Sequence, residues 1–268
     1  MEVFPLYATV QRINYLELAV YHFSTALLDP EWHGTGSVMP VNRLYLPISG
    51  EAIVSVGGKT VAMVPGFAYL IPAGAALDYH CDNAMEKIFV HFNFFRPDRY
   101  DALNGLGNIY RIPFPVSCYH NLLHHGMLGT ISGTLTVKNI LYDLLTQFQD
   151  AYGIIDEQIP IYTRTVMNAL AYVKENLSAN LLLDDIAKHC FVSRSTLADM
   201  FRKEVGIPLG KYIDDQLILA AQRQLSQSAD TIGQISNCLG YSNQCYFSRR
   251  FKQICGMSPQ TYRTNNKI

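Results

Sequence analysis

The sequence STLADMFRKEVGIPLGKYI at residues 195–213 reappears fifty residues later as CYFSRRFKQICGMSPQTYR at residues 245–263. The alignment pairs Phe201 with Phe251, and a glycine and a tyrosine also recur at matching places. Both copies have the apolar spacing of a helix with one buried side. A helical unit that occurs twice predicts a domain that performs one task at two places.

The segment in front of each copy predicts a short helix followed by a tight turn. In the first copy, Leu183–Ala187 is a short helix and Ser193 is the N-cap of the next one. In the second, residues 231–234 form a capping box, and Gly240 takes the left-handed position that Phe191 occupies in the first. One extra residue after the second turn changes the offset between the copies from 49 to 50. This order of elements is the helix-turn-helix motif.

A long amphipathic helix is predicted between the two motifs, over Pro208–Gln227. One helix-turn-helix pattern is weak evidence, because ordinary helix pairs also need a small residue and a turn, but two copies joined by a helix are specific. The second copy also contains Gly240-Tyr241, Tyr246-Phe247-Ser248-Arg249, Phe251-Lys252, Gly256, Ser258-Pro259 and Tyr262-Arg263. With this string, residues 166–265 closely resemble the DNA-binding domain of the AraC/XylS family of bacterial transcription regulators.

The resemblance implies that both recognition helices enter successive major grooves of double-stranded DNA, about 34 Å apart. Arg249 is suited to guanine and Gln244 to adenine, although Arg249 is equally suited to phosphate or to bracing a neighbouring helix. Asp199 would repel phosphate, so it either accepts from a cytosine amine or orients Arg194 or Arg202. The DNA-facing candidates are Arg194, Ser195, Ala198, Asp199, Arg202, Lys203, Asn243, Gln244, Cys245, Ser248, Arg249, Arg250 and Lys252, with the cationic Arg194, Arg202, Lys203, Arg250 and Lys252 as phosphate contacts. Apolar Leu197, Met200, Phe247 and Phe251 are expected to face the core.

Charge is divided unevenly along the chain. From residue 160 onward there are 13 Lys and Arg against 8 Asp and Glu, whereas residues 1–159 contain 8 against 14. The overall formal charge of −1 therefore hides a basic half and an acidic half. A basic half is attracted to the phosphate backbone, and its binding should weaken steeply with salt.

The first half has the texture of a small antiparallel sheet domain. Ala52–Val56 and Thr60–Val64 flank Gly57-Gly58-Lys59, which predicts a hairpin, and Lys87–Phe94 is a strand with period-two alternation. Short strands of this kind indicate a barrel or sandwich. The pattern is similar to the cupin-like sensor domain of many AraC/XylS regulators.

The expected fold class is therefore α+β, with an N-terminal antiparallel β-barrel (cupin-like) followed by an all-α domain with two helix-turn-helix units. We expect a ligand-sensing and dimerisation domain over residues 1–152, a linker over 153–163 and the DNA-binding domain over 164–268.

A barrel of this kind suggests a small-molecule effector bound among apolar, aromatic and a few polar side chains. The lone Trp, an Arg and the habits of the family favour a sugar. Alternation places Phe89, His91 and Asn93 on one face of their strand, which either lines the site or lies on the surface. The candidate ligand contacts are Trp32, His33, Arg43, Tyr45, Tyr79, His80, His91 and Asn93.

An enzymatic interpretation is disfavoured because the His-x-His and Glu pattern of metal-binding cupins is absent. We expect no catalytic residues, no metal and no cofactor. Two alternatives remain: a regulator of this family that has no small-molecule ligand and is controlled by a protein partner or by its abundance, and a cupin enzyme fused to a DNA-binding module.

A helix is predicted over Thr134–Tyr152, with Val137, Leu141, Leu144 and Phe148 at heptad-like spacing. This stripe pairs with a second subunit or is used wholly within its own domain, and the resemblance favours a homodimer. It also implies RNA polymerase as a partner and activation as the sign of regulation. No apolar run approaches the ~18 residues of a membrane span and the start lacks a signal peptide, so we expect no membrane association and a cytoplasmic protein with reduced cysteines.

Overall fold

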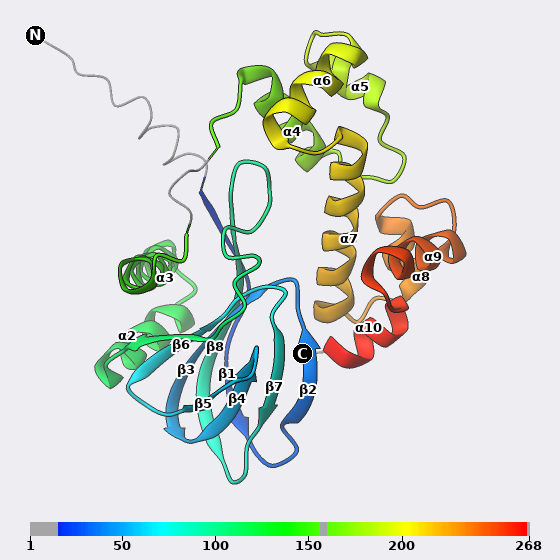
Figure 1. Ribbon diagram of the computed structural model, residues 1–268. Helices are drawn as coiled ribbons and strands as arrows, with labels where there is room; N and C mark the ends of the chain where they lie inside the picture. Colours follow the sequence, from blue (N-terminus) through cyan, green and yellow to red (C-terminus); the bar gives the residue numbers. More distant parts are fainter. Residues whose placement is uncertain (1–15, 156–159, 267–268) are drawn as a thin grey trace, which may run out of the picture. The chain divides into compact units, whose positions relative to one another are not determined.

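The computed structural model describes residues 16–155 and 160–266, which divide into two units (Figure 1). The sheet domain consists of Glu17–Phe94 and Asp101–Glu157, and the helical domain contains the chain from residue 158 onward. The expected α+β class, a sheet domain followed by a helical domain, is confirmed. The helical domain also includes Phe95–Tyr100, which the predicted boundaries placed with the sheet.

The sheet domain contains two sheets rather than one closed barrel. Its five-stranded sheet has the strand order β1-β8-β3-β6-β9, and its four-stranded sheet has the order β2-β7-β4-β5. The strands are β1 Glu17–Leu28, β2 His33–Val38, β3 Asn42–Gly50, β4 Ala52–Val56, β5 Lys59–Met63, β6 Phe67–Ile71, β7 Ala76–His80, β8 Met85–Phe95 and β9 Tyr110–Pro113. Strands that are close in sequence pair antiparallel, as in β4 with β5 and β3 with β6.

The predicted hairpin forms between β4 and β5. Gly57 and Gly58 make a two-residue turn with φ of 58° and 81°, which glycine adopts without strain. Val56 pairs with Lys59 across the turn, so Lys59 begins β5 rather than belonging to the turn.

Strand alternation gives the five-stranded sheet two different faces. Tyr45, Tyr69 and Ile71 join a core that also includes Val54 and Leu77 of the four-stranded sheet, so one face is turned toward the other sheet. The alternate residues of the same strands lie on the opposite face. The inner and outer faces therefore carry different chemistry.

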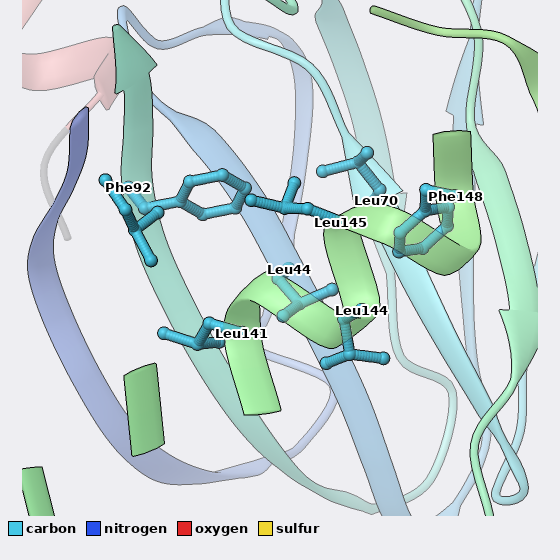
Figure 2. Close-up of a pocket in the computed structure, with 8 residues that line it drawn as sticks. Leu44, Leu70, Phe92, Leu141, Leu144, Leu145 and Phe148 are labelled. Carbon is cyan, nitrogen blue, oxygen red and sulfur yellow. The ribbon is translucent and has the colours of Figure 1, made fainter. Parts of the chain in front are cut away.

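Helix α3 (Ile131–Tyr152) covers the outer face, beside α2 (Val116–Met127). Figure 2 shows its apolar side chains over those of the strands. The contact is lined by Leu18, Leu44, Leu70, Phe92, Leu141, Leu144, Leu145 and Phe148.

This packing corrects the predicted dimer stripe. Leu141, Leu144 and Phe148 are 3%, 1% and 1% exposed, because they are buried against their own sheet. They are unavailable to a second subunit, whereas Val137 is half-buried. Their spacing was that of a helix lying on a sheet.

The helical domain is built around the long helix α7 (Leu209–Gln227), which confirms the predicted connecting helix. The α5–α6 pair lies at one end of α7 and the α8–α9 pair lies near the other (Figure 1). One core cluster joins residues of all these helices, including Ile186, Phe201, Leu217, Ile235 and Phe251. The remaining helices are α4 Arg164–Glu175, α5 Leu183–His189, α6 Arg194–Val205, α8 Ile232–Cys238, α9 Gln244–Cys255 and α10 Pro259–Asn266. In the part of the chain that the structure describes, no helix is long and apolar enough to cross a membrane.

The segment Phe95–Tyr100 is held in the helical domain by buried polar contacts. Asp98 is 2% exposed, pairs with the Arg96 guanidinium and accepts a hydrogen bond from Tyr162 Oη at 2.9 Å. Tyr100 Oη donates to Asp215 of α7 at 3.3 Å. A buried carboxylate needs such partners, and they fix this segment to the helices.

Candidate functional site

The two helix-turn-helix motifs have the same turn. Val192 N donates to Ala187 O at 3.1 Å, and Tyr241 N donates to Ser236 O at 3.0 Å, an equivalent bond 49 residues later. The turn residues Phe191 and Gly240 have φ of 56° and 74°, as expected from the alignment. Phe191 is thus a non-glycine residue in the left-handed region.

The recognition helices α6 and α9 begin and end alike. Ser193 Oγ accepts from Thr196 N at 3.1 Å, and Asn243 Oδ1 accepts from Tyr246 N at 2.8 Å, so each helix has a side-chain N-cap. Both helices end at a left-handed glycine. The offset between the caps is 50, and the extra residue after the second turn is confirmed.

One side of each recognition helix is anchored in the core. Leu197 of α6 and Phe247 and Phe251 of α9 are buried, and Met200 packs half-buried against the same cluster. These four residues face the core as predicted. The opposite sides are free for a partner.

The exposed side of α6 carries the predicted contacts of the first motif. All of Arg194, Ser195, Ala198, Asp199, Arg202 and Lys203 are exposed. Arg194 Nη1 lies 3.2 Å from Asp184 Oδ2, so its ion-pair partner is Asp184 of α5 rather than Asp199. Both side chains are more than half exposed, so this pair contributes at most about 1 kcal/mol and is available for exchange with phosphate.

The predicted DNA contacts of the second motif have different surroundings on α9. Gln244, Cys245, Arg249 and Lys252 are exposed, Ser248 is half-buried, and Asn243 is used as the N-cap. Arg249 has no hydrogen-bond partner among the described residues. Arg250 instead lies 2.5 Å from Asp214 of α7, and this hydrogen bond is the main cause that raises its pKa. Arg250 therefore braces α9 against α7, and its predicted phosphate contact stays a prediction.

The sheet domain brings several predicted ligand contacts together between its sheets. Arg43, Tyr45 and His91 are buried on the inner face of β3 and β8, where Arg43 and His91 are paired in register. Trp32 and Tyr79 lie beside the same core with ring centroids 4.4 Å apart. The side chain of His91 therefore points inward, which is one of the two orientations that the strand alternation allowed.

Three other predicted contacts lie elsewhere. His33 and His80 are exposed and paired across β2 and β7. Asn93 is buried, but its amide donates to Pro40 O at 3.0 Å and to Asp101 Oδ2 at 2.7 Å. Burial raises the pKa of Asp101, and the Asn93 hydrogen bond opposes that shift. Asn93 therefore supports a loop through its amide nitrogen, while its buried Oδ1 has no hydrogen-bond partner among the described residues.

Sequence reasoning missed Lys87 of β8. Its side chain is 3% exposed, with Nζ 3.6 Å from the Tyr45 ring centroid and 4.3 Å from that of Trp32. Burial, assisted by the charge of Arg43, lowers the pKa of Lys87 to about 7. The period-two pattern contained the signal, because Lys87 lies four residues before His91 and shares its face.

Metal-binding side chains do not converge in the described part of the chain. Over residues 16–155 and 160–266, no group of three or more His, Cys, Asp or Glu is placed to hold a metal ion.

Some known proteins match the helical part, and others match most of the chain. A family model for a helix-turn-helix domain matches residues 186–265. The HTH-type transcriptional activator AarP of Providencia stuartii is 35% identical over 101 residues, which cover 38% of this chain and 75% of AarP. The arabinose operon regulatory protein of Escherichia coli (strain K12) is 26% identical over 234 residues, covering 82% of this chain and 79% of its own length. The Msm operon regulatory protein of Streptococcus mutans is 22% identical over 262 residues, covering 94% of each chain.

The two motifs have the same structure, and the recognition helix of each has one side anchored in the core and one side exposed. This arrangement defines a DNA-binding transcription regulator of the helix-turn-helix class. The chain belongs to the AraC/XylS family.

The left-handed turn residue of the first motif gives a stability prediction. Phe191 is 95% exposed, so Phe191→Gly removes backbone strain of about 1–2 kcal/mol with little loss of burial. The greater freedom of glycine in the unfolded chain offsets part of this gain, so the free energy of unfolding should rise by about 0.5 kcal/mol. Gly240→Ala should lower it, because the new Cβ would lie 2.1 Å from Ser178 Oγ. Urea denaturation of both variants checks the pair. A destabilised Phe191→Gly protein would contradict this account of the turn.

The buried lysine gives a pH prediction. Lys87→Met should raise the free energy of unfolding most below pH 7, where Lys87 is protonated in the folded and unfolded states and its burial is costly. Between pH 7 and 10.5 the folded protein loses this proton first, so wild-type stability rises and the gain shrinks. Denaturation across this range measures the trend, with the exposed Lys59→Met as control. A gain that grows with pH would refute the assignment.

Proposed function

We propose that this protein is a transcription activator that reads two adjacent major grooves with α6 and α9 and responds to a sugar bound in the sheet domain. The observation that carries the DNA part is the pair of equivalent recognition helices on one core. Helix α7 has 19 residues, a length of roughly 28 Å at 1.5 Å per residue. This is comparable with the ~34 Å that separates successive major grooves on one side of B-DNA.

Residue chemistry supports different roles for the exposed side chains of α9. Arg249 is exposed and has a planar guanidinium that matches guanine O6 and N7, and Gln244 matches adenine N6 and N7. Lys252 near the end of the same helix carries a point charge suited to phosphate. The second motif is thereby the stronger reader of sequence, and the first motif contributes position through Arg194, Arg202 and Lys203.

The sugar response rests on the sheet domain and on the relatives. The aromatic pair Trp32 and Tyr79 adjoins buried polar groups, a combination that suits a polar ring. The arabinose operon regulator aligns with this chain over both domains. A sugar that favours one arrangement of the protein would shift its DNA binding.

The proposed regulator is a homodimer and contacts RNA polymerase. With Leu141, Leu144 and Phe148 buried, an interface through α2 and α3 would use their exposed apolar residues. These are Met127, Leu128, Ile131 and Leu135, next to the half-buried Val137. Their clustering around the α2–α3 connection supports association through this region.

Substitution of two basic residues on α9 tests the DNA assignment. Arg249→Ala should weaken binding to a selected site by about 1–3 kcal/mol and relax the preference at one base pair. Lys252→Ala should weaken binding to all sequences alike and lower the salt slope by about one. Fluorescence anisotropy over a salt series measures both, with Lys59→Ala as control. Equal losses on every sequence for Arg249→Ala would make it a phosphate contact.

A further inference from the structure

The interior of the sheet domain holds an unusual set of basic side chains. Lys87 and His91 lie on the same face of β8, and they are 3% and 4% exposed. Arg43 of β3 is 2% exposed and lies beside His91 in register. His22 of β1 contacts His91, with ring centroids 5.7 Å apart. Four basic residues from three strands thus meet in one place.

Burial, together with the neighbouring basic groups, disfavours the protonated forms of Lys87 and His91. Burial and the neighbouring Arg43, His22 and Lys87 lower the pKa of His91 to about 3. Burial and Arg43 lower the pKa of Lys87, and only Cys81 acts in the opposite direction. Among the residues that the structure describes, no carboxylate contributes to either shift.

Among the described residues, the members of this cluster differ in how many hydrogen-bond partners they have. Arg43 donates to the carbonyl oxygen of Ala75 at 3.1 Å and contacts Ser37. The ammonium of Lys87 rests on two aromatic rings, with no hydrogen bond to another described residue. Both ring nitrogens of His91 are buried without a hydrogen-bond partner among those residues. Buried polar groups normally have partners, so an acceptor that is not part of the described chain is indicated.

A purely structural role explains the cluster poorly. The aromatic faces of Trp32 and Tyr45 favour a cation, but apolar side chains of similar size would fill the same space without the cost of burying charge. A group that lowers stability and lacks partners is more often part of a binding site than of a core.

We infer that the effector of this regulator carries an anionic group, a carboxylate or a phosphate, which binds to Lys87 and His91 between the two sheets. This inference rests on the proposed function, in which the sheet domain binds a sugar, and narrows that effector to an acidic sugar. The anion supplies the missing acceptor for both side chains, and Trp32 and Tyr79 contact the sugar body.

Trp32 is the single tryptophan of the chain and lies beside Lys87, so its fluorescence reports binding directly. The full-length protein is titrated with galacturonate and glucose 6-phosphate, with galactose, glucose and inorganic phosphate in parallel. A saturable change should occur with at least one charged sugar, and its neutral counterpart should bind about tenfold more weakly or worse. Lys87→Met and Lys87→Gln should abolish this preference, whereas the exposed Lys59→Met should retain it.

Several results would overturn the inference. These are equal binding of neutral and charged sugars, a preference that survives both Lys87 variants, and no saturable change with any anion. Saturation by inorganic phosphate that is lost in both Lys87 variants supports the anion site but removes the sugar from the proposal. DNA binding is measured on the same samples by anisotropy. An anion that binds without altering DNA affinity supports the site and contradicts the sensing function, and absent DNA binding contradicts the regulator without affecting the fluorescence result.

Discussion

Helix α7 is the element on which both DNA-reading motifs depend. Its residues Tyr212, Leu217 and Leu225 are buried in the cluster that also contains Phe201 of α6 and Phe251 of α9. Because a close-packed core resists deformation, the two recognition helices cannot move independently at low cost. The Arg250–Asp214 pair adds a polar brace between α9 and the same helix. A protein that binds two adjacent major grooves requires a fixed spacing between its two recognition helices.

Strand alternation gives the two faces of the five-stranded sheet different surroundings. On β3, Leu44 packs under α3, while its neighbours Arg43 and Tyr45 point toward the other sheet. The outer face is apolar and packs against α3, whereas the inner face carries the buried basic residues Arg43, Lys87 and His91. The segment Phe95–Tyr100 begins at the last residue of β8 and is anchored in the helical domain through Asp98 and Tyr162. The strand that carries Lys87 and His91 is therefore covalently continuous with that domain.

Local rules predicted the helical domain well and the sheet domain in outline. The cap at Ser193 and the left-handed turns at Phe191 and Gly240 depend on residues a few positions apart, so the sequence contains the full signal. The Arg250–Asp214 pair joins residues 36 positions apart, and charge alone could not distinguish this brace from a phosphate contact.

The same limit explains the errors in the sheet domain. The leucines of α3 had a spacing that suits a sheet as well as a second helix, and burial against Leu44 and Phe92 decided the matter. The burial of Lys87 could not be predicted, because a lysine is usually found at the surface.

In the proposed mode of DNA binding, α6 and α9 read two sites held at a fixed spacing. Selection of bound genomic fragments by the purified full-length protein tests it most directly. We expect an enriched motif with two elements about 10 base pairs apart, whereas one element, variable spacing or no enrichment would contradict this mode of binding.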